Sequence, residues 1–435
     1  MIKVCKFGGS SVANAAQFRK IKDIVNKDNE RKIIVASACG KAYKEDHKVT
    51  DLLYLCEAHK KYGMSYDDIL SLIETKHQDI IDELDLHFNL KEEMDKIRDL
   101  LKKSSASDEL ISRGEYLSSR LLSIYLDAEF VDAKDVICFD YDGKLDIEST
   151  KEKFLPYLET QKKIVVPGFY GSLPNGVIKT MSRGGSDITG SLLANIADAK
   201  VYENWTDVSG IYVCDPRIIK DPKRIDIITY DELREMSYMG ANVLHDEAIF
   251  PVKEKDIPIN IRNTNEPDNE GTMIVSTADQ ASMPITGITG KKNFAVVTVV
   301  KSNSSSEVGF LKKALEVFEH YNIPIVLVTT GIDSFSVIID KNDIDTAIYE
   351  LANNIKIKLD CEDVSVYDGL SLVCVVGRGM KSKLGMSGKI FSLLGDNSIN
   401  IRTISQGADE ISIIVGVEEK DFTNTISSIY KEFVL

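Results

Sequence analysis

Residues Ile2 to Val12 read IKVCKFGGSSV, and this stretch gives the first indication of the fold. The run before the glycines predicts a short strand, and the pair Gly8 and Gly9 predicts a turn into a helix. Such a turn offers backbone amides at a helix amino terminus, and Lys6 adds a positive charge. The stretch therefore suits a phosphate group, although taken alone it also fits a plain strand-to-helix turn beside a surface lysine.

The pattern continues outward from this turn to about residue 274. Short β-branched runs at residues 32–37, 130–138, 163–168, 200–205 and 257–262 alternate with helical patterns. Such alternation predicts a mainly parallel sheet covered by helices on both faces, with ligands at the carboxyl ends of the strands. Residues 65–103 interrupt it: they are highly charged and have apolar residues at helical spacing, which predicts a helical excursion whose charges face solvent.

Two further glycine turns follow predicted strands. Residues 182–187 read SRGGSD and precede an expected helix, so an arginine, two glycines, a serine and Asp187 meet at one helix start. Asp187 is equally suited to cap that helix. Residues 205–212 read WTDVSGIY and lead into an expected hairpin that ends in DPR. Tyr212 and Arg217 in this segment are candidates for contacts with a base and a phosphate.

The carboxyl-terminal part contains an internal repeat. Residues 308–339 align without a gap on residues 384–415, an offset of 76 (384 − 308). Each copy contains a glycine, an amphipathic helix, a strand, a glycine turn and a second strand, which predicts two compact α+β units. The paired glycines, such as Gly309 and Gly385, and the ungapped register favour a duplication over chance similarity.

Composition excludes several classes of function. The net charge of −15, without a basic stripe, predicts no nucleic-acid partner. The apolar runs are too short to cross a bilayer and the amino terminus lacks a secretory pattern, so we expect a cytoplasmic protein without a membrane partner. Seven scattered cysteines without a CxxC pair predict reduced thiols, and the six histidines show no zinc-ligand spacing.

These segments together resemble the aspartate kinase family, a branch of the amino acid kinases. The matching motifs run in family order along nearly the whole chain: KFGGSSV (6–12), VASACG (35–40), TDLL (50–53), SRGEYLSS (112–119), RGGSD (183–187), TDVSGIY (206–212), DPR (215–217) and GANVLH (240–245). The tail resembles the paired ACT domains of that family. The resemblance implies an amino acid kinase fold, an open and mainly parallel α/β sheet between helical layers, followed by two α+β, ferredoxin-like ACT units.

The resemblance also implies domain boundaries. The catalytic domain is expected at residues 1–280, with the helical excursion at about 65–105. The first ACT region is expected at residues 281–365 and the second at 366–435. Because one ACT unit of the family is inserted within the other, the strand near residues 285–289 is a candidate for the second unit.

Each motif residue acquires an expected role from the resemblance. Lys6 is expected to contact the transferring phosphoryl group, and Asp187 to organise the catalytic site. Further contacts with phosphate and nucleotide are expected from Gly8, Gly9, Ser10, Thr206, Asp207, Tyr212 and Arg217. Residues expected to bind aspartate are Ser37, Thr50, Glu115, Arg183 and Ser186. Among these, Glu115 is expected to meet the ammonium group and Arg183 to clamp a carboxylate with two hydrogen bonds.

The implied reaction transfers the γ-phosphoryl group of ATP to the β-carboxylate of L-aspartate, the first step toward lysine, threonine and methionine. An ionised carboxylate attacks phosphorus without a general base, and Mg²⁺ carried by ATP offsets part of the repulsion. One alternative is a sibling kinase acting on glutamate, acetylglutamate, carbamate or a nucleotide, because the fold does not fix the acceptor. Another is a catalytically idle amino acid sensor. RGE at residues 113–115 favours aspartate, and the set Lys6, Arg183 and Asp187 favours an active enzyme.

The ACT pair implies feedback inhibition by an amino acid, with lysine the first candidate and threonine the second, and at least a homodimer. Residues expected to bind the effector are Ser304, Glu307, Gly309, Phe310, Leu311, Val326 and Thr330. Glu307 and Leu327 stand where lysine-sensitive relatives have a serine and an acidic residue. In the catalytic part, Asn242 replaces a basic residue of many members and Asp246 replaces a proline, which weakens the expected phosphate contacts of that loop.

Overall fold

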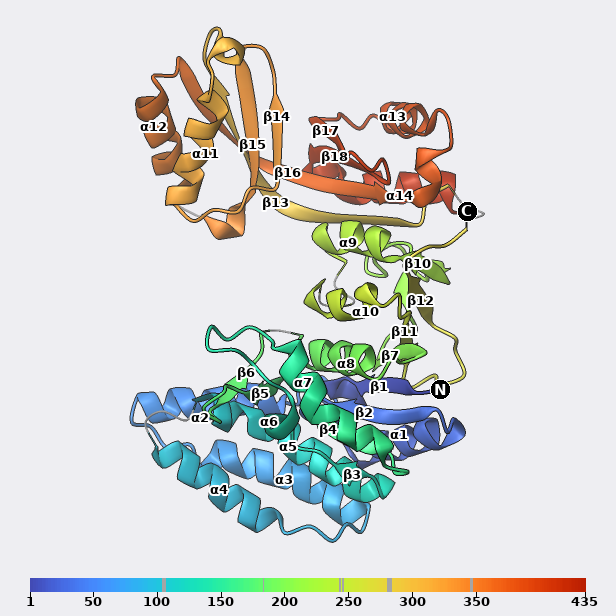
Figure 1. Ribbon diagram of the computed structural model, residues 1–435. Coiled ribbons are helices and arrows are strands. Elements are labelled where there is room, and N and C mark those ends of the chain that lie inside the picture. The colour runs from blue at the N-terminus through green and yellow to red at the C-terminus, as the bar shows by residue number, and fades with distance from the viewer. Residues whose placement is uncertain (104–106, 183, 242–243, 245, 280–283, 345–346) are drawn as a thin grey trace. The chain divides into compact units, whose positions relative to one another are not determined.

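A computed structural model describes residues 1–103, 107–182, 184–241, 244, 246–279, 284–344 and 347–435 (Figure 1). The chain forms two compact units. The first contains residues 1–211, 226–230 and 242–278, and the second contains residues 212–225, 231–241 and 279–435. Arg183 and Asn242, both named in the sequence predictions, lie outside the described residues.

An eight-stranded sheet forms the centre of the first unit, in the order β10-β12-β11-β7-β1-β2-β4-β3. Its described strand pairs run parallel, apart from the antiparallel pair β11 and β12. This confirms the predicted mainly parallel sheet. The strands are β1 (Lys3–Phe7), β2 (Arg31–Ala36), β3 (Glu129–Phe130), β4 (Ile164–Pro167), β7 (Val201–Thr206), β10 (Ile227–Thr229), β11 (Ile259–Asn263) and β12 (Thr272–Val275). Two small hairpin sheets contain β5 (Tyr170–Ser172) with β6 (Ile178–Thr180) and β8 (Ile211–Tyr212) with β9 (Arg224–Ile225).

Helices cover both faces of the sheet (Figure 1). Side chains alternate between the faces of a strand: Cys5 and Phe7 of β1 join the large apolar core with α1 to α5, whereas Lys6 points to the face that carries α8. The helices of this unit are α1 (Ala15–Lys27), α2 (Val49–Lys61), α3 (Asp67–Glu83), α4 (Leu90–Lys102), α5 (Ser107–Leu126), α6 (Ala133–Val136), α7 (Ile147–Phe154), α8 (Gly185–Ile196) and α10 (Phe250–Glu254). This alternation lets Lys6 serve a site while its neighbours stabilise the core.

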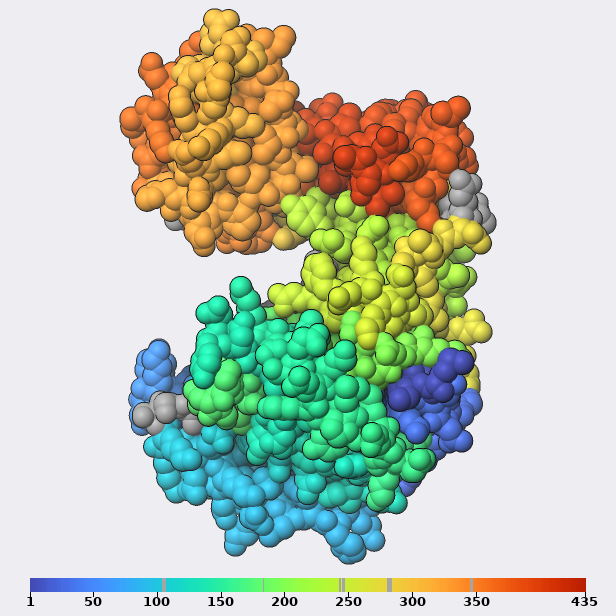
Figure 2. All heavy atoms as spheres, viewed as in Figure 1, coloured from blue at the N-terminus to red at the C-terminus, as the bar shows by residue number. Residues whose placement is uncertain are grey.

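Residues 65–103 form α3 and α4, two amphipathic helices. Most of their apolar residues, such as Ile73 and Met94, are buried in the core, and most of their charged residues are exposed. The two helices lie on the surface of the first unit (Figure 2, light blue). Across the described part of the chain, no helix is both long enough and apolar enough to span a membrane.

The second unit contains a six-stranded antiparallel sheet in the order β14-β15-β13-β16-β18-β17. Its strands are β13 (Gly287–Val300), β14 (Leu327–Thr330), β15 (Ser334–Asp340), β16 (Asp363–Val376), β17 (Thr403–Gln406) and β18 (Ser412–Glu418). Residues 294–300 of β13 pair with β15, whereas residues 370–376 of β16 pair with β18. The two long strands therefore run through both α+β halves.

The predicted repeat is present in these two halves. Its helices are α11 (Phe310–His320) and α13 (Met386–Asp396), each followed by an edge strand, β14 or β17. Gly309 and Gly385 precede the two helices in the same left-handed conformation, with φ of 78° and 80°. The remaining helices of the unit are α9 (Tyr230–Tyr238), α12 (Ile348–Leu359) and α14 (Phe422–Phe433).

Candidate active site

The predicted phosphate turn lies where β1 ends. The chain passes from Phe7 through Gly8 into a short 3-10 helix at residues 9–12. The Gly8 N–H donates to the Trp205 carbonyl over 2.9 Å, and the Ser11 N–H donates to the Gly8 carbonyl over 2.9 Å. The turn is therefore fixed against the carboxyl end of the neighbouring strand β7, which is the edge where a parallel sheet binds ligands.

The segment after β2 packs directly on this turn at Gly9 and Gly40. The Gly40 N–H donates to the Gly9 carbonyl over 2.9 Å. A Cβ atom on Gly40 would lie 2.5 Å from the Gly9 carbonyl carbon, and one on Gly9 would lie 3.1 Å from the Ala38 carbonyl oxygen. Glycine is required at Gly40 because no side chain fits this approach. The contact brings the candidate aspartate-binding segment at Ser37 beside the phosphate turn.

The two predicted catalytic residues meet in an ion pair. Lys6 Nζ lies 2.6 Å from Asp187 Oδ1, with 10% and 15% of the two side chains exposed. Asp187 belongs to the first turn of α8, where its N–H donates to the Gly184 carbonyl over 2.8 Å. Partial burial strengthens the attraction between the two charges, and the exposed fraction leaves a path to a ligand. Ser186, the neighbouring candidate, is buried.

Glu115 carries an unusual carboxylate. Its side chain is buried in α5, and its Oε2 atom has no hydrogen-bond partner. Burial raises the pKa of the Glu115 carboxyl to about 8, although backbone N–H groups, including that of Ala38, act in the opposite direction. A buried acid without a full set of partners needs a cationic ligand to ionise at neutral pH. This is the chemistry expected of a site for an ammonium group.

Ser37 and Thr50 lie on segments that pack near the Glu115 backbone. The Ser37 carbonyl accepts the hydroxyl of Ser118 over 2.6 Å, one turn beyond Glu115 on α5. Thr50 is half-buried at the start of α2, which is anchored where the Val49 N–H donates to the Cys39 carbonyl over 2.9 Å. The structure thus places Ser37, Thr50 and Glu115 on three segments of the first unit.

The candidate nucleotide loop begins where β7 ends, at Thr206, the last residue of that strand, and Asp207. Its Ser209 hydroxyl donates to Glu266 Oε2 over 2.7 Å and accepts from Asn263 Nδ2 over 2.9 Å. Asn263 and Glu266 were not predicted from the sequence. Their signal is a polar run, RNTNE at residues 262–266, which begins at the last residue of a predicted strand, where ligand-facing residues are expected.

Thr264 joins this loop to the phosphate turn and was also not predicted. Its N–H donates to the Thr206 carbonyl over 2.9 Å, and its hydroxyl lies 2.7 Å from the hydroxyl of Ser11. Thr264 is fully buried. The two loops that follow β1 and β7 are therefore held together by one residue that follows β11.

Tyr212 and Arg217 belong to the second unit. There the Arg217 guanidinium pairs with Asp215 over 2.6 Å, and 88% of its side chain is exposed. This pairing lowers the pKa of the Asp215 carboxyl.

Across the described residues, no group of three or more histidine, cysteine, aspartate or glutamate side chains is arranged to hold a metal ion.

The candidate effector residues surround the start of α11. The Glu307 carboxylate pairs with Lys301 and Lys313, each over 3.0 Å, and these lysines lower its pKa. The Phe310 ring lies in the core against Phe335, with 5.7 Å between ring centres, so a ligand can reach the Phe310 backbone rather than its ring. Ser304 is buried, and its hydroxyl donates to the Ile332 carbonyl over 3.3 Å.

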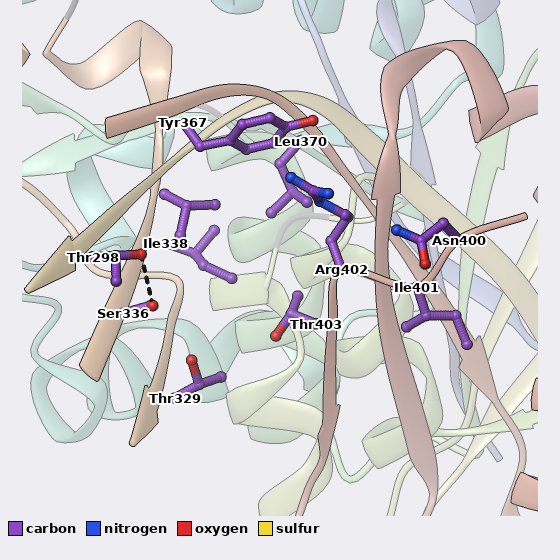
Figure 3. Close-up of a pocket in the computed structure, with 11 residues that line it drawn as sticks. Thr298, Thr329, Ser336, Ile338, Tyr367, Leu370, Asn400, Ile401, Arg402 and Thr403 are labelled. Atoms are coloured by element: carbon purple, nitrogen blue, oxygen red, sulfur yellow. Dashed lines mark hydrogen bonds between the residues drawn. The ribbon is translucent and has the colours of Figure 1, made fainter. Parts of the chain in front are cut away.

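A pocket of about 350 Å³ opens beside the candidate effector strand β14 (Figure 3). Thr329 of β14 lies on its border, and Thr298 and Ser336 form a hydrogen bond of 2.9 Å at its wall. The Arg402 guanidinium lies 4.7 Å from the centre of the Tyr367 ring on the opposite side. This pocket combines hydroxyl groups, apolar side chains and one cation.

Two parts of the chain match two different protein-family models. Residues 1–263 match the model of the amino acid kinase family, and residues 373–433 match an ACT domain model. Aspartokinase 3 of Bacillus subtilis is 35% identical over 99% of this chain and 98% of its own length.

Solved structures agree with this assignment. The aspartate kinase of Clostridium acetobutylicum has a TM-score of 0.94 and 45% identity, and the match covers 99% of this chain and 100% of that chain. Escherichia coli aspartokinase III, in complex with aspartate and ADP, has a TM-score of 0.77 and 27% identity over 99% of each chain. The same enzyme in complex with lysine and aspartate has a TM-score of 0.76 and 27% identity over all of both chains. With its glycine turns, its Lys6–Asp187 pair and its repeated tail, this chain belongs to the aspartokinase branch of the amino acid kinase family.

Proposed function

We propose that this chain is an ATP-dependent aspartate kinase, which forms 4-phospho-L-aspartate and ADP on the route to lysine, threonine and methionine. The observation that carries the proposal is the ion pair of 2.6 Å between Lys6 and Asp187, placed beside the Gly8 turn at the carboxyl edge of the sheet. The aspartate and ADP bound to E. coli aspartokinase III support the same substrates for this chain.

The arrangement suits phosphorylation of a carboxylate. The β-carboxylate of aspartate has an ordinary pKa of about 3.9, so it is ionised at neutral pH and needs no general base. The main barrier is repulsion between this anion and the triphosphate, which Lys6, the amino end of α8 and the Mg²⁺ that enters with ATP offset. An ammonium group has three donors, so the bond from Lys6 to Asp187 leaves capacity for a phosphoryl oxygen.

Substrate selection is assigned to Glu115 and Arg183. The buried and incompletely partnered Glu115 carboxylate is suited to the ammonium group of aspartate. Arg183, at the residue before Gly184, is the proposed clamp for a substrate carboxylate, because a guanidinium donates two parallel hydrogen bonds. Ser37, Thr50 and Ser186 complete the proposed aspartate pocket, and Ser10, Thr206, Asp207, Tyr212 and Arg217 the proposed nucleotide contacts.

The second unit is proposed to bind an amino acid effector, lysine before threonine, and to inhibit the kinase. The lysine bound to E. coli aspartokinase III supports this choice. The proposed contacts are the backbone at Gly309 to Leu311 and the strand segment from Val326 to Thr330. We also propose a homo-oligomer, at least a dimer through the ACT units, located in the cytoplasm.

A coupled assay of ADP release tests the proposed reaction. Purified chain is supplied with MgATP and, separately, aspartate, glutamate and acetylglutamate, with the Lys6→Met variant as control. The proposal predicts release with aspartate that the variant lacks. Release with glutamate or acetylglutamate but not aspartate would assign a sibling kinase, and no release with any acceptor would favour an idle sensor.

A further inference from the structure

Asn204 lies beside Lys6 in the central sheet, because β1 and β7 run parallel and their register pairs these two residues. Asn204 Nδ2 donates to Asp187 Oδ1 over 2.9 Å. The same carboxylate oxygen lies 2.6 Å from Lys6 Nζ. One oxygen of Asp187 therefore holds a cation from one strand and a neutral amide from the next.

Strand β7 also holds the backbone of Asp187. Tyr202, two positions before Asn204 and on the same face of the strand, donates its hydroxyl to the Asp187 carbonyl over 3.2 Å. Asn204 is 3% exposed and Tyr202 is fully buried, so both bonds are shielded from water. Asp187 is thus fixed at its backbone and at its side chain by residues of a rigid strand.

We propose that Asn204 is a positioning residue for phosphoryl transfer: it orients the Asp187 carboxylate and, through it, the ammonium group of Lys6. This inference rests on the function proposed for the Lys6–Asp187 site. An amide suits the task because it donates to the carboxylate without adding a charge that competes with Lys6 or repels the triphosphate.

Loss of the amide frees the Asp187 side chain to rotate, and the Lys6 ammonium moves with it. A displacement of about 1 Å at a reacting centre is enough to lower the rate about 100-fold. Binding of aspartate does not depend on this orientation, because the proposed ammonium site is at Glu115. The inference therefore predicts a change in kcat without a matching change in the KM for aspartate.

The test compares Asn204→Leu with Asn260→Leu. Asn260 is a matched control: it is a buried asparagine of the same sheet, on β11, and its Nδ2 donates to the Glu270 carbonyl over 3.1 Å. Both variants place a leucine in the sheet and remove one hydrogen bond. Steady-state kinetics with MgATP and aspartate and the thermal midpoint are measured for each variant and for the unaltered chain.

The expected result is a fall in kcat of at least 10-fold for Asn204→Leu, with the KM for aspartate within about twofold, at a thermal midpoint similar to that of Asn260→Leu. Asn260→Leu is expected to keep its kcat within about twofold. Normal kcat in Asn204→Leu, equal losses in both variants, or a change confined to the KM for aspartate would each overturn the inference. An unaltered chain without kinase activity would instead refute the proposed function.

Asn204→Asp provides a second test that conserves side-chain volume. It replaces the amide that donates to Asp187 Oδ1 with a second carboxylate, which repels the Asp187 carboxylate and the triphosphate. We expect a kcat at least 10-fold lower and a raised KM for ATP, again with little change for aspartate. If Asn204→Leu does not fold, unaltered kinetics of Asn204→Asp overturn the inference alone.

Discussion

Glu203 accepts two hydrogen bonds from Arg31 inside the central sheet, from Nε over 2.8 Å and from an η nitrogen over 3.1 Å. The Trp205 indole N–H donates to the same carboxylate over 3.0 Å. Since the Trp205 carbonyl holds the Gly8 N–H, this buried pair supports the strand end that fixes the phosphate turn.

Removal of Glu203 is expected to be costly. Glu203→Ala leaves the Arg31 guanidinium buried without its counter-ion, so we predict a loss of about 3–5 kcal/mol in the free energy of unfolding. The double variant Arg31→Met, Glu203→Leu should recover part of this loss, because the Arg31 charge is removed together with its counter-ion, whereas Arg262, whose guanidinium lies 4.0 Å from Glu203, still loses a partner. Urea denaturation measures the free energy of unfolding of both variants. Asp99→Ala serves as the control, because Asp99 belongs to an exposed pair with Lys102, and its denaturation midpoint is expected to stay unchanged. Equal midpoints for Glu203→Ala and the control would contradict the account.

The Glu115→Gln variant tests whether Glu115 binds the ammonium group of aspartate. The variant cannot offer a charge to the substrate ammonium, so we predict a rise in the KM for aspartate of about 10- to 100-fold, while the KM for ATP stays unchanged. The exposed Glu152→Gln is the control.

The same variant has a defined pH dependence. The pKa of Glu115 is raised to about 8 from 4.5, so its contribution to stability is fully present below pH 4.5 and is lost as the pH rises through 8. Glu115→Gln should therefore be more stable than the unaltered protein at pH 7.5 without ligand, by about 4 kcal/mol, and the difference should vanish near pH 4.5. A destabilised variant at pH 7.5 would show that Glu115 has a charged partner in the free protein.

Much of the catalytic part was predictable because its signals are local. The Gly8 turn follows its own strand, and Asp187 stands at its own helix start, so each could be recognised from adjacent residues. Asn204 could not, because its role depends on β7 lying next to β1 in a register that pairs it with Lys6. Strand order in a parallel sheet is set by long connections and packing, which a local pattern does not contain.

Prediction from the sequence was limited in a similar way for the carboxyl-terminal part. The strand expected near residues 285–289 is the start of β13, which continues to Val300 and serves both halves of the sheet. Phe310 was expected to bind the effector, but it is the first residue of α11, and helical periodicity directs its ring into the core. The repeat itself could be recognised from the sequence, because a duplication leaves matching residues at equal spacing in the two copies.

His77 is buried in the helical excursion and is expected to make its stability sensitive to acid. Its Nδ1–H donates to the Ile73 carbonyl over 2.7 Å, and its buried Nε2 has no partner. Burial lowers the pKa of His77 from 6.5 to about 4, so the stability it contributes is present above pH 6.5 and is lost as the pH falls through 4. We predict that His77→Phe removes about 3 kcal/mol of the acid-induced loss. Urea denaturation at pH 7 and pH 4 checks this, with the exposed His87→Phe expected to keep the original dependence.

Gly309 and Gly385 permit a matched test of the effector site. Both have φ near 80° and open space around the position of a Cβ, so alanine at either costs about 1 kcal/mol through backbone strain alone. Gly309→Ala should also raise the lysine concentration for half-inhibition of the kinase activity severalfold, because it shifts the amides of the proposed site. Gly385→Ala should not. Equal inhibition curves for the two variants would remove the first ACT half as the effector site, and no inhibition of the unaltered enzyme by lysine or threonine would remove the regulatory proposal.

The central claim is that Lys6 promotes phosphorylation of the aspartate β-carboxylate, and trapping the acyl phosphate with hydroxylamine tests it most directly. The unaltered chain with MgATP and aspartate should accumulate the hydroxamate of aspartate. Lys6→Ala should lose about 3 kcal/mol or more of transition-state stabilisation, at least a 100-fold lower rate, while leaving the fold intact. The exposed Lys151→Ala should match the unaltered chain. Hydroxamate formation by Lys6→Ala at a near-normal rate, or its absence in the unaltered chain, would contradict the account.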